Sequence, residues 1–270
     1  METMERLRED WDDLAEIDAV WFNVPSRHLR GSSERFYESG TKQLRQKLDL
    51  LDRLRVSLKR DAALDFGCGI GRVTQALAGE FSLVYGVDIS TKMIDIARAR
   101  NRHGDRCQYL THSRPDLSIF DTGQFDLVFS NNVLQHNPPD LIRVYLTEFV
   151  RTLRPNGVLL FQIPIRRAEN HTNRRLTSLP RVHPRRVWNK LKGMLIGHSS
   201  SDRYYRLRRL GFSTRWLGRT LGLHPMIAMN HVDETVICET LAAGGSSVRH
   251  VEMYEYEDMT HAFFLCVKSA

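Results

Sequence analysis

The chain has 270 residues, of which 41% are hydrophobic and 26% are charged, and its formal net charge is +7. This length can bury one large core, or one core that carries an insertion or a cap. No stretch approaches the roughly 18 consecutive apolar residues of a membrane span, and the charged amino terminus lacks the apolar segment of a signal peptide, so we expect a soluble, cytoplasmic protein.

Residues 1–60 are predicted to form a helical cap. Apolar residues recur at helical spacing in two stretches, which are separated by a loop through Pro25 and Gly31. The second helix is expected from Gly40 to Leu58. The apolar positions are Trp11, Leu14, Ile17, Trp21 and Phe22 in the first helix, and Leu44, Leu48, Leu51 and Leu54 in the second.

Strand and helix patterns alternate from residue 62 to residue 163. We expect strands at 62–66, 82–87, 106–110, 125–130 and 158–163, and helices at 71–79, 91–102 and 138–153. This alternation predicts a parallel sheet with right-handed crossovers, whose ligand site lies at the carboxyl ends of the strands. Further along, Asp233 is expected to cap a helix, and strands at 248–254 and 262–267 to form a closing hairpin.

A basic segment interrupts this pattern. Between Ile165 and Pro225 there are fifteen Lys and Arg residues against two acids, which gives the segment a charge of +13 and leaves −6 for the remainder. We therefore expect a mildly acidic core, made of residues 61–164 and 226–270, that carries a basic insertion at 165–225.

The spacing of the cysteines and histidines does not match that of metal ligands. The four cysteines lie far apart with no C-x-x-C pair, which favours buried or free thiols over a zinc site or a disulfide framework. The histidines are scattered without H-x-x-x-H spacing. We predict no metal, and the sequence leaves the oligomeric state open.

Three alternate glycines follow the first strand. At Gly67, Gly69 and Gly71 the backbone can turn sharply and approach a ligand, and the helix that opens behind them offers unpaired N–H groups. Asp88 ends the second strand, where an acid can accept hydrogen bonds from a ribose diol. A nicotinamide fingerprint, G-x-G-x-x-G, would need glycine where this chain has Arg72.

Asp65 stands two residues before the first glycine, and the segment 65–71 resembles motif I of class I S-adenosylmethionine (SAM) dependent methyltransferases. The resemblance implies an α/β, Rossmann-like sheet of seven mostly parallel strands with an antiparallel last strand, and SAM as cofactor with S-adenosylhomocysteine (SAH) as product. It covers about residues 60–165, with looser agreement over 232–268. The other similar segments are Gly86–Met93 after motif I, Phe125–Ser130 as the strand of motif IV, and Leu153–Leu159 before the fifth strand.

The resemblance also implies roles for single residues. The loop Gly67–Gly71 passes beneath the methionine part of SAM, Asp65 lies near its amino group, and Asp88 takes the ribose hydroxyls. Ile89 and Met93 flank the adenine.

The segment after the third strand departs from the family pattern. Many relatives have an acid there that meets the adenine amine, and the nearest acid in this chain is Asp116. Leu117 is an alternative that covers the ring. In the loop after the fourth strand, Asn131 and Gln135 are expected to contact the amino acid part of SAM or a substrate hydroxyl.

Residues 7–40 resemble the amino-terminal cap of a bacterial subgroup of these enzymes, through Trp11, Trp21 and the segment 36–40. Such caps often fold over bound SAM and exclude water. The lid candidates are Phe36, Tyr37 and Gly40, with Tyr37 as a cofactor contact. Alternatively, the aromatic residues only pin the cap to the sheet.

Methyl transfer from a sulfonium is an in-line displacement, so the protein mainly aligns acceptor, methyl carbon and sulfur. An alcohol acceptor must also lose its proton, a task that suits histidine. His136 is the first candidate, because the resemblance places its loop beside the methyl group; alternatively, it only approaches the next helix. His231 is the second, because the insertion returns to the sheet near it.

In this family the segment after the fifth strand commonly shapes the acceptor pocket. Here that segment is rich in arginine and aromatic residues, which suit nucleic acid, an anionic lipid surface, or a phosphorylated or carboxylated substrate; a solvated face that pairs with the acidic remainder is the alternative. We predict O-methylation of a carbohydrate, glycolipid or other small molecule, with at most peripheral membrane contact. The alternatives are an RNA methyltransferase, although RRM and KH patterns are absent from the sequence, and a non-catalytic SAM-binding or polyanion-binding module.

Overall fold

The computed structural model describes residues 2–24, 26, 28, 32–167, 200–256 and 258–270. The chain divides into two compact units, of which one is Met1–Arg167 with Ile227–Ala270 and the other is Ala168–Met226. Residues 168–199 of the predicted insertion lie outside the described residues. The domain boundaries that the sequence predicts, after residues 60, 164 and 225, stay predictions.

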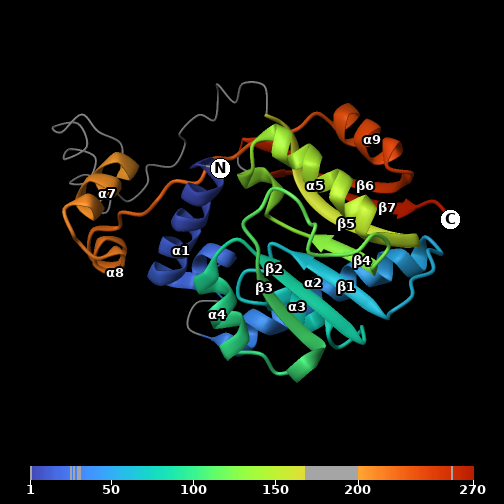
Figure 1. Cartoon of the computed structure of the whole chain (residues 1–270), viewed down its shortest axis with the longest axis horizontal. Coiled ribbons are helices and arrows are strands. Elements are labelled where there is room, and N and C mark those ends of the chain that lie inside the picture. Colours follow the sequence, from blue (N-terminus) through green and yellow to red (C-terminus); the bar gives the residue numbers. More distant parts are fainter. Residues whose placement is uncertain (1, 25, 27, 29–31, 168–199, 257) are drawn as a thin grey trace, which may run out of the picture. The chain divides into compact units, whose positions relative to one another are not determined.

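In the described part of the first unit, seven strands form one sheet in the order β3-β2-β1-β4-β5-β7-β6 (Figure 1). Strands β1 to β5 are parallel, and β7 lies antiparallel between β5 and β6. The predicted Rossmann-like sheet with an antiparallel last strand is therefore confirmed. The strands are β1 (Ala62–Phe66), β2 (Leu83–Asp88), β3 (Cys107–Thr111), β4 (Phe125–Ser130), β5 (Leu153–Arg167), β6 (Ser246–Tyr256) and β7 (Met259–Lys268).

The strand order reverses at β1, which lies between β2 and β4. Asp65 near the end of β1 is level with Gly86 in β2 and with Phe129 in β4. The loops that leave these three strands therefore emerge side by side. Such a switch point is where open α/β sheets bind their ligands.

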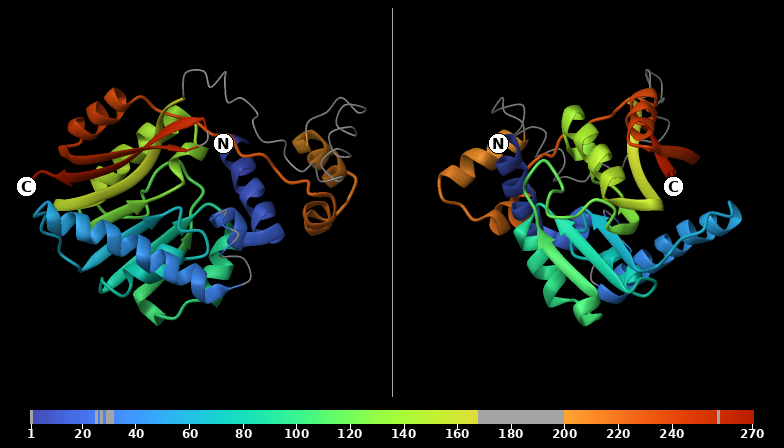
Figure 2. Two further views of the ribbon diagram at one scale, coloured as in Figure 1. Left: turned by 180° about the vertical axis from the view of Figure 1, so that it is seen from behind. Right: turned by 45° about the vertical axis from the view of Figure 1, so that its right-hand side comes forward.

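Helices cover both faces of the sheet (Figure 2). Neighbouring strand residues point to opposite faces, so that Leu127 joins one buried cluster and Val128 the other. The first cluster includes residues of α2 (Ser33–Arg53), α3 (Arg72–Leu77) and α4 (Thr91–Ala99), and the second includes residues of α5 (Pro139–Thr152) and α9 (Glu234–Ala243).

The amino-terminal helix α1 (Glu2–Asn23) is broken by a kink. Asp18 has the non-helical φ and ψ of −165° and 87°, and its Oδ1 accepts the N–H of Trp21 at 3.0 Å. The carboxylate thus caps the second half of the helix, as an N-cap aspartate does.

Helix α2 starts earlier than the sequence predicts. It begins at Ser33 rather than Gly40, because the Oγ of Ser32 accepts the N–H of Arg35 at 3.3 Å and caps the helix there. Gly40 lies inside the helix, where a Cβ would stand 2.3 Å from the carbonyl oxygen of Arg72. The sequence pattern predicts Gly40 at the helix start, whereas the structure needs this glycine for close packing of α2 against α3.

Strand β5 is longer than its apolar run of 158–163. At its start Leu153 pairs with Phe125, and at its end Arg167 pairs with Met259. Just before the apolar run the strand is irregular, with Asn156 at a φ of 62° and a register shift against β4. Pairing with both neighbours extends the strand beyond what side-chain pattern alone indicates.

The described part of the second unit, residues 200–226, is helical, with α7 (Ser200–Arg209), α8 (Thr214–Trp216) and the π-helical turn η3 (Leu217–Leu221). Tyr204, Leu217 and Leu223 form its small buried cluster. The hydroxyl of Tyr204 donates to Oγ1 of Thr214 at 3.4 Å.

Among the described helices of both units, none combines the length and the apolar character that crossing a bilayer demands.

The contact beside Gly40 predicts that an alanine at this position lowers the stability of the protein. Alanine normally stabilises a helix interior relative to glycine by about 1 kcal/mol. Because the added methyl group would overlap the Arg72 carbonyl, we expect Gly40→Ala to lower the free energy of unfolding by about 1–3 kcal/mol in urea titrations. Lys42→Ala, at an exposed position of the same helix, is the control with little expected effect. A stabilised Gly40→Ala protein would contradict the packing of α2 on α3.

Candidate functional site

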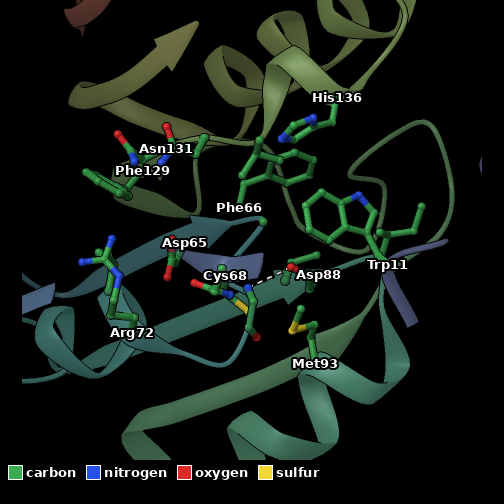
Figure 3. A pocket seen from close by; sticks show the side chains of 18 of the residues that line it. Trp11, Asp65, Phe66, Cys68, Arg72, Asp88, Met93, Phe129, Asn131 and His136 are labelled. Carbon is green, nitrogen blue, oxygen red and sulfur yellow. Dashed lines mark hydrogen bonds between the residues drawn. The ribbon is translucent and has the colours of Figure 1, made fainter. Parts of the chain in front are cut away.

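A pocket of about 950 Å³, partly open to solvent, lies at the carboxyl ends of the parallel strands (Figure 3). Helix α1, the glycine loop after β1, the end of β2, the start of α4 and the loop after β4 all contribute to its wall. The predicted site residues that line it are Asp65, Gly67, Gly69, Asp88, Ile89, Met93, Asn131 and His136.

The glycine loop is packed tightly by three other elements. Gly67, Gly69 and Gly71 have φ angles of 73°, 54° and 81°, which side chains rarely permit. A Cβ on any of them would also overlap a neighbouring side chain. The nearest atoms to the three Cβ positions belong to Val133 (2.2 Å), Asn23 (1.6 Å) and Tyr109 (2.4 Å), respectively.

Asp88 ties the glycine loop to β2. Its Oδ2 accepts the backbone N–H of Gly69 at 2.8 Å, and its Oδ1 accepts the N–H of Ser90 at 2.9 Å. Burial raises the pKa of Asp88 to about 6, although the N–H groups of Ser90 and Gly69 oppose this shift. The carboxyl group therefore fixes the loop and lines the pocket at the same time.

Asp65 and Arg72 form a second polar group in the pocket wall. Asp65 is buried, its Oδ2 accepts the hydroxyl of Thr74 at 2.7 Å, and burial raises its pKa to about 6. Arg72 is 8% exposed, and its guanidinium donates to Ser39 Oγ at 3.4 Å and to Gln43 Oε1 in α2. No acceptor among the described residues reaches its buried Nε. The pocket thus contains a buried cation with spare donor capacity beside a carboxyl group.

Two acids of α1 hold that helix on the start of α4. Asp12 Oδ1 accepts the hydroxyl of Ser90 at 2.7 Å and the N–H of Lys92 at 3.0 Å, and Glu16 pairs with the Lys92 ammonium group. Asp12 thereby satisfies a donor in the first turn of α4. This attachment places Trp11 over the pocket, where Figure 3 shows its ring beside that of His136.

His136 lies in the short helical turn η2 (Leu134–His136) after β4. Its Nδ1 is 3.2 Å from the carbonyl oxygen of Ala228, and its ring meets the ring of Trp11 edge to face at a centroid distance of 5.3 Å. A carbonyl only accepts, so Nδ1 carries the proton and Nε2 keeps its lone pair. Burial lowers the pKa of His136, with partial opposition from the Ala228 carbonyl. The imidazole is therefore neutral near pH 7 and able to accept a proton.

A buried chain of hydrogen bonds holds the loop that carries His136. Asn132 has a φ of 60°, and its N–H donates to Oε1 of Gln162 at 3.1 Å. The amide nitrogen of Gln162 is 2.6 Å from Nδ1 of His261, on the antiparallel strand β7. The loop conformation thus depends on the central strands of the sheet.

Six predicted site residues lie outside the pocket lining; one is Gly71, the last glycine of the loop, and the other five follow. Tyr37 is buried below the glycine loop, where its hydroxyl donates to the Ile70 carbonyl at 3.1 Å. Leu117 is fully buried in the core beside α5, and the carboxylate of Asp116 accepts from Ser118. The remaining two are Gln135, a buried residue whose carbonyl accepts the Asn230 N–H at 2.7 Å, and His231, which is exposed. As site residues these six stay predictions.

Sequence reasoning missed several residues of the pocket wall. Trp11 was recognised only as a cap aromatic, and Arg72 only as the residue that excludes a nicotinamide fingerprint. Asn23 and His112 gave no signal, because they come from the end of α1 and from the loop after β3. Only Arg72 had a usable sequence signal, because its position directly after the third glycine places it next to the predicted ligand loop.

Among the described residues, no cluster of three or more His, Cys, Asp and Glu side chains has the arrangement of a metal site.

Residues 63–157 match the family described as "Methyltransferase domain". This match identifies the segment as a methyltransferase domain. The resemblance seen in the glycine motif and the segments after it is thereby confirmed.

Curated relatives match a similar stretch. The ubiquinone biosynthesis O-methyltransferase of Thiobacillus denitrificans is 30% identical over 118 residues, which is 43% of this chain and 50% of that protein. Phosphoethanolamine N-methyltransferase 2 of Caenorhabditis elegans is 34% identical over 100 residues, or 36% of this chain and 22% of that protein. The chain spans about half the length, or less, of these relatives.

Among solved structures, the magnesium protoporphyrin IX methyltransferase of Synechocystis PCC 6803 with bound SAH has a similar fold. The TM-score is 0.59 at 18% identity, over 98% of this chain and 99% of that chain. This likeness extends the agreement in fold beyond the matched domain to nearly the whole chain.

The buried acids predict an unusual pH dependence of stability. The pKa of Asp88 is raised from 3.8 to about 6, so between these values the folded protein keeps a proton that the unfolded chain has lost. This group therefore makes the folded state less stable as pH rises from about 4 to about 6, and adds no further change above that. We expect the free energy of unfolding of Asp88→Asn to rise by about 2–3 kcal/mol relative to wild type over this window, measured by urea titration at several pH values.

Asp95→Asn, at an exposed position of α4, serves as the control and should follow the wild-type profile. A difference between Asp88→Asn and wild type that does not change with pH would show that Asp88 is ionised in the folded protein already at pH 4.

Proposed function

We propose that this chain is a SAM-dependent methyltransferase that transfers the methyl group to a hydroxyl oxygen of a small molecule. One observation carries the proposal: Asp65, Asp88, the loop glycines Gly67 and Gly69, and His136 line a single pocket. The matched methyltransferase domain supports the same reading.

The pocket residues fit the parts of SAM by their chemistry. Asp88, at the end of β2, would accept the ribose hydroxyls, and the apolar side chains of Ile89 and Met93 would flank the adenine. At the other end of the pocket the amino acid part would meet Asp65 through its ammonium group and Arg72 through its carboxylate. The unpaired buried Nε of Arg72 supports this last assignment, because a buried donor without a partner is costly unless a ligand satisfies it.

When bound, SAM supplies a methyl group on a sulfonium centre. The task of the protein is then to align the acceptor and to take its proton. The Nδ1–H of His136 donates to the Ala228 carbonyl, which leaves Nε2 free to accept the proton of an acceptor hydroxyl. Trp11 and Phe22 add apolar walls from α1 that exclude water from the reacting groups.

The names of the relatives support the choice of the atom that is methylated. The name of the Thiobacillus relative indicates O-methylation, and this supports oxygen as the methylated atom. The name of the Caenorhabditis relative indicates a nitrogen acceptor instead, so amines are included among the acceptors to be tested. A screen with radiolabelled SAM against phenols, sugars, glycolipids, amines and RNA identifies the acceptor. Labelling of RNA alone would favour the alternative of an RNA methyltransferase, and SAM binding without any labelled product would favour a non-catalytic module.

Substitutions separate the binding role of Asp88 from the proton-accepting role of His136. We expect Asp88→Ala to weaken SAM and SAH binding by about ten- to hundredfold, because a charged acceptor for the ribose is lost. His136→Ala should leave this affinity nearly unchanged and slow turnover by about a hundredfold or more, because only the proton acceptor is lost. Calorimetry with SAH and single-turnover assays measure the two effects.

The matched controls are Asp95→Ala, on the exposed side of α4, and His103→Ala, in the turn before β3. Equal loss of SAH affinity in Asp88→Ala and His136→Ala would refute the division of roles.

Arg72 is tested with two ligands. SAH carries the amino acid carboxylate, whereas 5′-methylthioadenosine has the same nucleoside without it. Because Arg72 would contact only the carboxylate, Arg72→Ala should weaken SAH binding by about ten- to hundredfold and leave methylthioadenosine binding unchanged. Asp88→Ala, in contrast, should weaken the binding of both ligands.

The contact between Arg72 and α2 needs its own control. Gln43→Ala removes a hydrogen-bond partner of the guanidinium in α2 but leaves the guanidinium in place. If Gln43→Ala weakened SAH binding as much as Arg72→Ala, Arg72 would act by holding α2 rather than by binding the carboxylate.

A further inference from the structure

A sharp corner in the second unit brings exposed apolar and basic residues together. Helix α7 ends at Arg209, and Gly211 has a φ of 88°. The N–H of Gly211 donates to the Arg208 carbonyl at 3.0 Å, and the N–H of Phe212 donates to the Leu207 carbonyl at 3.1 Å. These two bonds form the Schellman motif, which reverses the chain direction at the end of a helix.

The apolar side chains at this corner are exposed and do not belong to the buried cluster of the unit. Leu210, just before Gly211, is 75% exposed, and Phe212, just after it, is 42% exposed. The Phe212 ring stacks on that of Trp216, which is 43% exposed, at a centroid distance of 5.4 Å. Tyr204 and Leu217 fill the interior instead. Three large apolar side chains thus remain in contact with water at one corner.

Basic side chains flank these apolar residues. Arg206 and Arg209 lie in the last turn of α7, and Arg215 lies in α8; all three are exposed. Asp202 is the one acid between residues 200 and 226, against six arginines. No ion pair with a described residue engages Arg206, Arg209 or Arg215.

We name this surface the basic apolar corner, and it consists of Arg206, Arg209, Leu210, Phe212, Arg215 and Trp216. We propose that the corner docks on the surface of an anionic lipid bilayer. Interfacial segments combine Trp, Phe and Leu side chains, which enter the boundary of the acyl chains, with Arg side chains that meet the phosphates. The proposal goes beyond methyl transfer and does not rest on it.

The apolar side chains favour a lipid surface over nucleic acid. A protein that binds single-stranded nucleic acid offers aromatic rings on which bases stack. At this corner the two rings stack on each other, with an angle of 26° between their planes. The most exposed apolar residue is an aliphatic leucine, which offers nothing to a base or a phosphate but enters a bilayer interface favourably.

Vesicle sedimentation with the full-length chain tests the proposal. We expect binding to vesicles of phosphatidylcholine mixed with phosphatidylserine, and much weaker binding to pure phosphatidylcholine. Removing two charges with the double variant Arg209→Gln, Arg215→Gln should weaken binding by about thirtyfold. Leu210→Ser should weaken it by about tenfold, and this loss should persist at high salt because it does not depend on charge.

Two substitutions in the first unit are matched controls, namely Arg249→Gln for the charge and Ile119→Ser for the exposed apolar side chain. Neither should change vesicle binding. SAH binding is measured on the same samples, so that failure of membrane docking is distinguished from failure of the proposed methyltransferase function.

Absence of binding to the mixed vesicles would overturn the proposal, as would binding that Leu210→Ser leaves unchanged. Competition with single-stranded RNA covers the alternative ligand. If RNA bound more tightly than the vesicles, and if the arginine variant but not Leu210→Ser reduced its binding, the corner would be a polyanion site rather than a membrane site.

Discussion

The hydrogen bond from the Gly69 N–H to the carboxylate of Asp88 connects the two loops on which the pocket depends. It joins the turn after β1 to the end of β2, and the parallel register of these strands brings the two groups together. It acts together with the N–H groups of Gly67 and Cys68, which donate to the Val87 carbonyl at 2.7 and 3.0 Å, to hold a loop whose glycines restrict the backbone little. The same bond places the half-buried carboxyl group of Asp88 at the wall of the pocket. The carboxylate of Asp88 therefore has two tasks, since it holds the glycine loop and also lines the pocket.

The cap contributes to the site through ordinary helix capping. Asp12 supplies an acceptor to the first turn of α4, and Asp18 supplies one to the second half of α1. The first attachment places Trp11 over the pocket, and the kink at the second leads to Asn23, whose side chain fills the space beside Gly69. An amino-terminal helix that could have been a passive cover thus forms part of the pocket wall. Helix α2 has a different task, since it packs against α3 below the loop.

The ionisable groups of the pocket have forms near neutral pH that suit the methyl transfer we propose. Burial raises the pKa of Asp65 and of Asp88 to about 6, so both are mostly charged at pH 7. Burial lowers the pKa of His136, so the imidazole is neutral and can accept a proton. The second unit has the opposite electrostatic character, with arginines beside exposed apolar residues. We assign chemistry to the first unit and attachment to the second, and neither proposal depends on the other.

The sequence by itself determined the alternation of strands and helices along the chain and the residues of motif I, because strand and helix periodicity and the three alternate glycines are local signals. It also indicated His136 and the basic segment. Local pattern misplaced the start of α2, since only the contact of Gly40 with Arg72 explains a glycine inside that helix. It gave no role to Arg72 or Asn23, although both line the pocket. These features depend on contacts between residues far apart in the chain, which only the tertiary structure decides because packing, not spacing, brings them together.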